Sequence, residues 1–253
     1  MKYSLCIETC FNDIDLYDRI RIAKDLGFDA VEFYNPADMD LKKLKAALEE
    51  SGMPVAIMGY YNGFSDRLTG DFDLIFENLK KGVAFGKEVG CLTFTSHVCA
   101  AGPEPECTRK KLVENLKKMA PYLERENVTL AIEVLNSKYE APDYLLDTTE
   151  KAFSVINEVG CGRVKILNDL FHTQIMEGDI INTVKTGWNK TAHYHAASVP
   201  KRDELFHGEL NYREVARALD EVGYEGYMGM EYWPSYDNMQ SYRDVLAYMK
   251  TNA

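Results

Sequence analysis

The stretch RVKILNDLFH (Arg163–His172) decides how the rest of the chain is interpreted. Its apolar run, Val164–Leu167, predicts a buried strand. A buried strand does not accommodate a carboxylate in its middle, so we expect Asp169 at the end of this strand, facing a cavity. An aspartate three residues before His172 in such a place would begin a metal site. The alternative is that Asp169 caps a following helix and His172 is an ordinary surface residue, since Asp is a favoured N-cap.

Similar short runs recur along the chain and alternate with helical patterns. The predicted strands are Tyr3–Ile7, Ala30–Tyr34, Val55–Met58, Leu92–Thr95, Val128–Val134, Val164–Leu167, Thr191–Ala196 and Tyr227–Met230. The predicted helices are Ile14–Leu26, Leu41–Leu48, Phe72–Glu88, Arg109–Glu126, Tyr212–Val222 and Ser241–Met249. Gly27, Gly90 and Gly223 each follow a predicted helix and lead into the next strand, as C-cap glycines do.

Alternating strands and helices without a linker or a low-complexity run predict an α/β protein, a single (β/α)8 TIM barrel domain over residues 1–253. A doubly wound open sheet is the alternative. That fold would normally carry a G-x-G-x-x-G motif or a P-loop after an early strand, and the sequence contains neither.

Composition narrows the class of function. A formal net charge of -11 argues against nucleic-acid binding, which needs a basic face. The N-terminus lacks the long apolar region of a signal peptide, and no segment has the length of a membrane span. The 6 cysteines are scattered without a C-x-x-C pair, so we expect reduced thiols in a cytoplasmic protein.

The last four predicted strands each deliver a polar side chain to the same rim of the barrel, where active sites of this fold lie. These side chains are Glu133, Asp169, a histidine of the pair His193 and His195, and Glu231. Crowded carboxylates repel one another unless a cation neutralises them. Oxygen ligands with one imidazole suit Mg²⁺, Mn²⁺ or Co²⁺ better than a closed zinc site. The spacing therefore predicts a divalent-metal site.

Other polar residues are also expected near this rim of the barrel. His195 lies closer to the strand's exit, whereas His193 lies one layer below it, as a core histidine or a partner of the metal ligand. We expect His172 to contact a bound ligand from the loop after Asp169, and His97 to line the pocket. Arg202 could clamp an anionic group, or belong to a solvated Lys-Arg pair. Aromatic residues that could wall the pocket are Phe11, Tyr60, Tyr61, Phe64 and Trp233.

Five strings of the C-terminal half resemble the hydroxypyruvate isomerases, members of the xylose-isomerase-like TIM barrels. They are IEVLN (132–136), DLFHxQxMEG (169–178), VPxR (199–202), GELNY (208–212) and GxEY (229–232). The resemblance implies that Glu133, Asp169, His195 and Glu231 bind a divalent metal. It also implies that Glu133 and Glu231 form the acid/base pair and that His172 and Arg202 contact substrate; His97 and Tyr61 are further candidates for substrate binding. Barrels of this family often form homo-oligomers.

The expected reaction is an enediolate proton transfer between the two glutamates on a small hydroxy-carbonyl or keto-sugar substrate. One position departs from the isomerase pattern, because His195 stands where hydroxypyruvate isomerases have Gln and ketose epimerases have His. The alternatives are therefore a ketose 3-epimerase, or a lyase or dehydratase on an inosose or oxidised glycoside. An apurinic-site endonuclease would need many His ligands and a basic groove, whereas this chain has 5 His. A non-catalytic carbohydrate-binding role would require a site that holds no metal.

Overall fold

The strands form a closed parallel barrel. The structure, a computed structural model, describes residues 1–62 and 67–250. Neighbouring strands pair in the order of the sequence, and the last pairs with the first, which confirms the TIM-barrel prediction. The strands are β1 Lys2–Cys6, β2 Ala30–Phe33, β3 Val55–Gly59, β4 Thr93–Ser96, β5 Thr129–Val134, β6 Val164–Asp169, β7 Thr191–Ala196 and β8 Tyr227–Met230.

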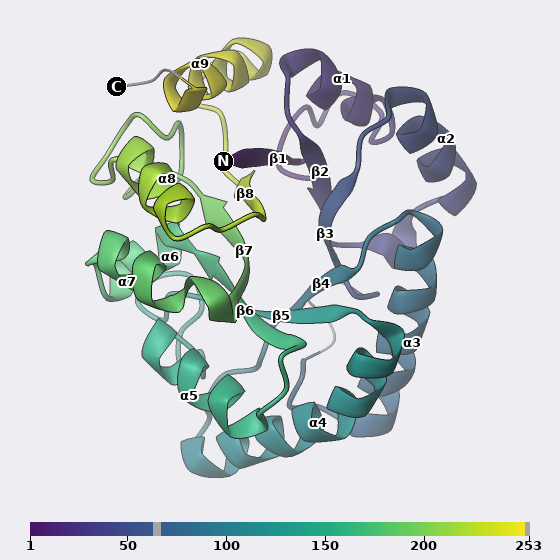
Figure 1. Ribbon diagram of the computed structural model, residues 1–253, viewed down its shortest axis with the longest axis vertical. Coiled ribbons are helices and arrows are strands. Elements are labelled where there is room, and N and C mark those ends of the chain that lie inside the picture. Colours follow the sequence, from purple (N-terminus) through teal and green to yellow (C-terminus); the bar gives the residue numbers. More distant parts are fainter. Residues whose placement is uncertain (63–66, 251–253) are drawn as a thin grey trace.

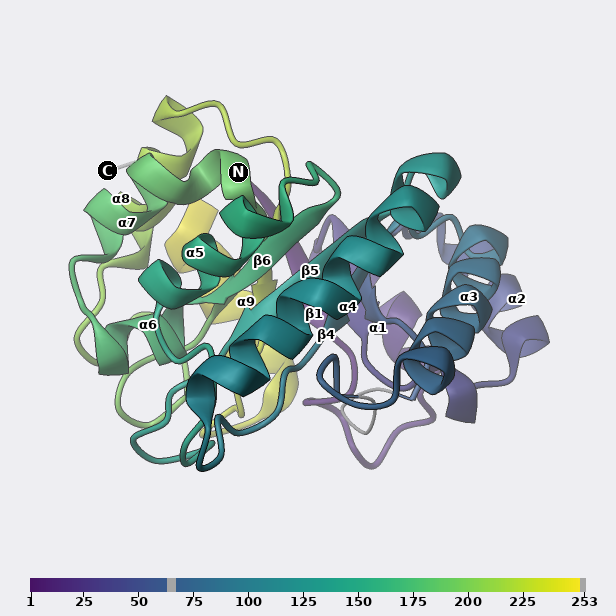
Figure 2. The same ribbon diagram turned by 90° about the horizontal axis from the view of Figure 1, so that it is seen from below.

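Helices surround the barrel on its outside (Figure 1). They are α1 Asp18–Leu26, α2 Leu41–Ser51, α3 Phe72–Glu88, α4 Pro105–Glu126, α5 Thr149–Val159, α6 Leu170–Met176, α7 Ile180–Gly187, α8 Tyr212–Glu221 and α9 Asn238–Lys250. Two short 3₁₀ turns, η1 Pro36–Asp38 and η2 Trp188–Lys190, complete the described elements. Figure 2 shows the long helix α4 running along the outside of the barrel next to α5.

Most predicted elements are present within a few residues of their expected ends, but α5, α6 and α7 were not expected. Helix α6 follows β6 without a connecting loop, so the prediction that His172 lies on a loop is wrong. Strand β6 also runs two residues further than expected and includes Asp169. The three junction glycines take positive φ angles of 91°, 73° and 78°, which only glycine adopts readily.

Side chains alternate between the barrel interior and the helix layer. Ile57, Ala131 and Leu167 form a small apolar cluster separate from the main core. Ala131 and Leu167 stand two residues before Glu133 and Asp169, on the same faces of β5 and β6. The interior is therefore apolar below and polar toward the carboxyl ends of the strands.

All six cysteines are free, and four of them are buried. Among the helices of the described residues, none is long and apolar enough to cross a membrane.

Candidate active site

Four buried side chains converge at the carboxyl ends of β5 to β8. Glu133, Asp169, His195 and Glu231 each offer one ligand atom, and these atoms lie within 4.8 Å of one another. Strand pairing accounts for part of this arrangement, because Asp169 is the direct neighbour of His195 across β6 and β7. The Nδ1 atom of His195 lies 3.3 Å from Glu231 Oε2 and 3.9 Å from Glu133 Oε1. The four residues that the strand ends singled out are thus brought together.

The guanidinium of Arg202 lies against these carboxylates. Its Nη2 donates to Glu231 Oε2 at 2.7 Å and to Asp169 Oδ2 at 3.1 Å, while Nη1 donates to Glu140 Oε2 at 2.7 Å. The guanidinium carbon Cζ lies 4.8 Å from the ring centre of Phe171 and 5.0 Å from that of Trp233. Burial disfavours the charged form, but the surrounding carboxylates raise the pKa of Arg202. Arg202 therefore belongs to the site and is not part of a solvated pair.

Glu133 is held by an imidazole. The Nε2 atom of His97, which follows β4, lies 2.5 Å from Glu133 Oε2. Burial opposes ionisation of this glutamate, but the contact with His97 lowers its pKa overall. His97 also lines a cavity of about 440 Å³, together with Glu140 and Tyr144. The prediction that His97 lines a pocket is consistent with this arrangement.

Glu231 is held by a phenol. Tyr34, which directly follows β2, donates its hydroxyl to Glu231 Oε1 at 2.5 Å. Burial raises the pKa of Tyr34 well above its usual value, so the phenol keeps its proton and remains a donor. Burial also opposes ionisation of Glu231, but His195 and Arg202 lower its pKa well below the usual range.

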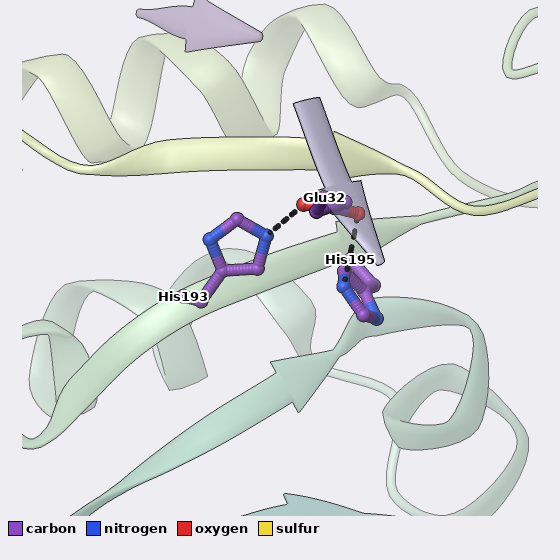
Figure 3. Close-up of side chains that lie close together, drawn as sticks. All are labelled: Glu32, His193 and His195. Atoms are coloured by element: carbon purple, nitrogen blue, oxygen red, sulfur yellow. Dashed lines mark ion pairs between the residues drawn. The ribbon is translucent and has the colours of Figure 1, made fainter. Parts of the chain in front are cut away.

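His195 has a second carboxylate on its opposite side. Glu32 Oε1, on β2, lies 3.2 Å from His195 Nε2, and Glu32 Oε2 lies 2.8 Å from His193 Nε2 (Figure 3). Burial would raise the pKa of Glu32, but the two imidazoles lower it to about 2. His193 therefore contacts the partner of a candidate ligand.

Asp169 caps a helix and also lies in the cluster of candidate ligands. Its Oδ1 accepts a hydrogen bond from the backbone N–H of Phe171 at 2.9 Å and so caps α6. Its Oδ2 faces Arg202 and lies 3.4 Å from His172 Nε2. Asp169 therefore caps α6 and also lies in the cluster, so the two interpretations of this residue are compatible. Burial raises the pKa of Asp169 to about 7, with Arg202 acting in the opposite direction.

His172 is neutral and points toward the site. The Nδ2 amide of Asn136 donates to its Nδ1 at 2.6 Å, which leaves a proton on Nε2. Burial, together with the neighbouring charge of Arg202, lowers the pKa of His172 to about 3. The Nε2 atom lies 4.0 Å from Glu140 Oε2. His172 therefore presents a neutral N–H donor between Asp169 and Glu140.

The aromatic residues named as possible pocket walls lie in different places. Trp233 covers Arg202 at the rim. Phe11 packs in the core, with its ring 5.8 Å from that of Tyr242. Tyr61 stacks under Lys81 of α3 at 5.3 Å, and no contact in the described part of the chain joins it to the four clustered residues. Phe64 lies outside the described residues.

Three residues of the site were not identified from the sequence: Glu32, Tyr34 and Glu140. Glu32 interrupts a buried apolar strand in the same way as Glu133 does, so the same argument applied to the first four strands would have found it. Tyr34 and Glu140 lack such a signal, because tyrosine at a strand end and glutamate in a loop are common.

The donor set fits a divalent metal ion. Three carboxylates and one imidazole are the ligands that Mn²⁺, Mg²⁺ and Co²⁺ accept. Both ring nitrogens of His195 are buried, and none of the described residues offers either one an aligned hydrogen bond. A ligand that takes up the lone pair of Nδ1 would satisfy this atom.

Known proteins resemble this chain over most of its length. The family model described as xylose isomerase-like TIM barrel matches residues 20–252. The chain belongs to this family. It is 30% identical over 248 residues to the hydroxypyruvate isomerase of Escherichia coli (strain K12), covering 92% of this chain and 94% of that protein.

Two further proteins are similar to this xylose isomerase-like chain, one in sequence and one in structure. The 2-oxo-tetronate isomerase of Haemophilus influenzae is 27% identical over 242 residues, covering 92% of this chain and 93% of that protein. The crystal structure of AP endonuclease, family 2, from Brucella melitensis superposes with a TM-score of 0.87 at 25% identity, covering 95% and 96% of the two chains. Relatives of this barrel thus carry the names of isomerases and of an endonuclease.

Proposed function

We propose that this protein is a divalent-metal-dependent isomerase of a small hydroxy-carbonyl or keto-sugar substrate, most similar in its reaction to hydroxypyruvate isomerase. The observation that carries the proposal is the pair Glu133 and Glu231, whose buried carboxylates lie in one cluster with Asp169 and His195. Two carboxylates on opposite sides of a bound substrate can remove a proton from one carbon and return it to another.

Glu133, Asp169, His195 and Glu231 would hold the metal, which supplies Lewis-acid polarisation of the carbonyl and adjacent hydroxyl oxygens of the substrate. The chain's own residues carry the proton. One glutamate, as a carboxylate, removes the proton next to the carbonyl. The other glutamate must enter the reaction in its protonated form, and it gives its proton to the resulting enediolate. His97 and Tyr34 occupy one oxygen of each glutamate and so hold each carboxylate in one orientation.

Arg202 and His172 would orient the substrate. Arg202 provides a guanidinium that stabilises negative charge on a substrate oxygen. His172 provides a neutral N–H donor beside it, fixed by Asn136. The adjoining cavity of about 440 Å³ is of the size that suits a small molecule. Tyr61 remains a candidate on sequence grounds alone.

A ketose 3-epimerase is the second candidate, and His195 is the residue that favours it. An epimerase would use the same two glutamates to return the proton to the opposite face of the same carbon. A lyase or dehydratase could use the same base, but its product differs in mass from the substrate. An endonuclease is not proposed, because a net charge of -11 opposes binding to a phosphate backbone.

The test is a panel of hydroxypyruvate, 2-oxo-tetronate, free ketoses and inososes, incubated with Mn²⁺, Mg²⁺ or Co²⁺ and followed by proton NMR in deuterated water. Isomerisation with deuterium incorporation would support the proposal. Glu133→Gln and Glu231→Gln should each abolish turnover and leave the melting temperature within a few degrees. Near-normal rates in both variants, or full activity after exhaustive chelation, would contradict the proposal.

A further inference from the structure

The carboxylate of Glu32 is a buried charge that none of the proposed proton transfers uses. Its side chain is 0% exposed and comes from β2, on the far side of His195 from the clustered carboxylates. Burying an ionised group costs free energy unless partners compensate it. The partners of Glu32 are two histidines and a serine. These contacts fix the position of its carboxylate.

The two oxygens of Glu32 have separate partners. Ser4 donates its hydroxyl to Oε2 at 2.8 Å, and His193 Nε2 lies 2.8 Å from the same atom. Oε1 faces Nε2 of His195 at 3.2 Å. Figure 3 shows the two imidazoles, both from β7, reaching the carboxylate at its two ends. One oxygen is therefore occupied, and the other is directed at His195.

The neighbouring strand leaves room for this carboxylate. Gly229 of β8 pairs with His195, and a Cβ atom at Gly229 would lie 2.3 Å from Glu32 Oε1. Any larger residue at position 229 would have to push the carboxylate away from the imidazole. The φ angle of Gly229 is not positive, so its backbone conformation does not require glycine. Glycine is required here for lack of space.

The ring of His195 lies between two carboxylates at nearly equal distances. Glu32 lies 3.2 Å from Nε2, and Glu231 lies 3.3 Å from Nδ1. A neutral imidazole carries one proton, and only the unprotonated nitrogen can bind a metal. A proton on Nδ1 would pair with Glu231 and block metal binding. A proton on Nε2 would pair with Glu32 and leave the lone pair of Nδ1 directed at the site.

We propose that Glu32 is a positioning residue, which holds His195 in the Nε2–H tautomer so that Nδ1 can bind the metal. His193 and Ser4 would hold Glu32 in turn. This inference rests on the proposed function, since it assumes a metal at the four clustered residues. Partners of this kind commonly tune metal affinity without touching the metal.

A purely structural role for Glu32 predicts a different outcome. Buried ionic groups are often replaceable without loss of stability, provided that no uncompensated charge is left. Glu32→Gln keeps the shape of the side chain and removes its charge. If Glu32 acts on His195, this variant should lose metal affinity whether or not its stability changes. If Glu32 only supports the fold, the variant should lose stability and bind the metal as the wild type does.

The experiment uses the full chain and Mn²⁺ as the probe, with affinity measured by electron paramagnetic resonance. Histidine tautomers are measured by ¹⁵N NMR of the protein in the presence of Mg²⁺, which is diamagnetic. We expect Glu32→Gln to bind Mn²⁺ about 10- to 100-fold more weakly and to show a population of the Nδ1–H tautomer at His195. Gly229→Ala should have a similar effect, because it displaces the carboxylate without removing it. This second variant keeps the test valid if Glu32→Gln folds poorly.

Glu204→Gln is the matched control. Glu204 is equally buried, but it accepts hydrogen bonds from Ser235 and Ser241, and no contact within the described ranges links it to the clustered residues. Mn²⁺ affinity should stay within about twofold of wild type in this control.

Wild-type affinity in both Glu32→Gln and Gly229→Ala would overturn the inference while leaving the proposed function intact. So would an Nδ1–H tautomer in the wild type, or two Mn²⁺ ions per chain with Glu32 as a ligand. Failure of the wild type to bind Mn²⁺ at all would instead overturn the proposed function, and the inference with it.

Discussion

Glu133 and Glu231 are identical side chains in different surroundings. Glu133 has an imidazole at 2.5 Å, whereas Glu231 has a phenol at 2.5 Å and the Arg202 guanidinium at 2.7 Å. Charge-assisted hydrogen bonds of this kind are stronger than neutral ones and fix the geometry of the carboxylate. The two glutamates are therefore expected to respond differently when their partners are removed.

Tyr34→Phe tests this point for Glu231. Loss of a hydrogen bond to a charged group costs about 1.5–3 kcal/mol, so we expect kcat to fall about 10- to 100-fold. Tyr194→Phe is the control, since Tyr194 is equally buried but packs against Tyr224 on the outer face of β7. Steady-state kinetics with the best substrate of the panel provides the measurement. Equal rates in wild type and Tyr34→Phe would show that the phenol does not position Glu231.

Arg202 supplies positive charge to the clustered carboxylates. Removing one partner of a buried ion pair costs about 3–5 kcal/mol, so Arg202→Ala should be destabilised by about that amount in the presence of a chelator. Addition of Mn²⁺ should recover much of the loss, because the cation compensates the same carboxylates. Urea unfolding with and without Mn²⁺ measures both effects. A loss of stability that Mn²⁺ leaves unchanged would count against a shared site.

The candidate ligands could be predicted from the sequence because each is a polar residue that ends or interrupts an apolar strand. The residues that hold them were harder to predict. Tyr34 and Glu231 are 197 residues apart, and they meet only because the barrel closes between β8 and β1. Periodicity is a local signal and contains no information about such contacts. Glu32 interrupts a buried apolar strand as Glu133 does, so it could have been predicted in the same way.

At the scale of elements, the strands were predicted more completely than the helices. A buried parallel strand is a continuous apolar run, which is easily recognised. Helices α6 and α7 have seven and eight residues, too few for a helical period to stand out. Helix α5 begins at a Thr148 cap, where the hydroxyl accepts from the N–H of Lys151. This capping signal in the segment after β5 was not used.

Helix α3 packs closely against the segment after β3, and Gly82 makes this possible. A Cβ atom at Gly82 would lie 1.2 Å from the carbonyl oxygen of Tyr60. Alanine is the better helix former by about 1 kcal/mol, but a backbone clash of this size outweighs that gain. We expect Gly82→Ala to lose about 3 kcal/mol or more.

The control for this substitution is Gly162→Ala, where a Cβ atom would meet nothing within 4 Å. Its stability should change by less than about 0.5 kcal/mol. Urea unfolding monitored by circular dichroism compares the two variants. Equal stability of Gly82→Ala and wild type would mean that α3 can move away from β3 at little cost.

For the whole molecule, a metal bound only to the folded state stabilises the entire barrel. A ligand at about 100 times its dissociation constant contributes about 2.7 kcal/mol, which raises the melting temperature of a chain of this size by about 5–10 °C. We expect Mn²⁺ or Co²⁺ to produce such a shift, a chelator to reverse it, and Glu231→Gln to reduce it strongly. Differential scanning calorimetry provides the measurement. An equal shift in Glu231→Gln would place the metal elsewhere on the protein.

The site is also divided between the two halves of the chain. The four candidate ligands lie between Glu133 and Glu231, whereas three of the groups behind them, Glu32, Tyr34 and His97, come from the first half. A chimera that took its second half from this chain and its first half from another barrel would inherit the ligands without the residues that orient them. In recombination between related barrels, the two halves would therefore have to be exchanged with matching partners at these three positions.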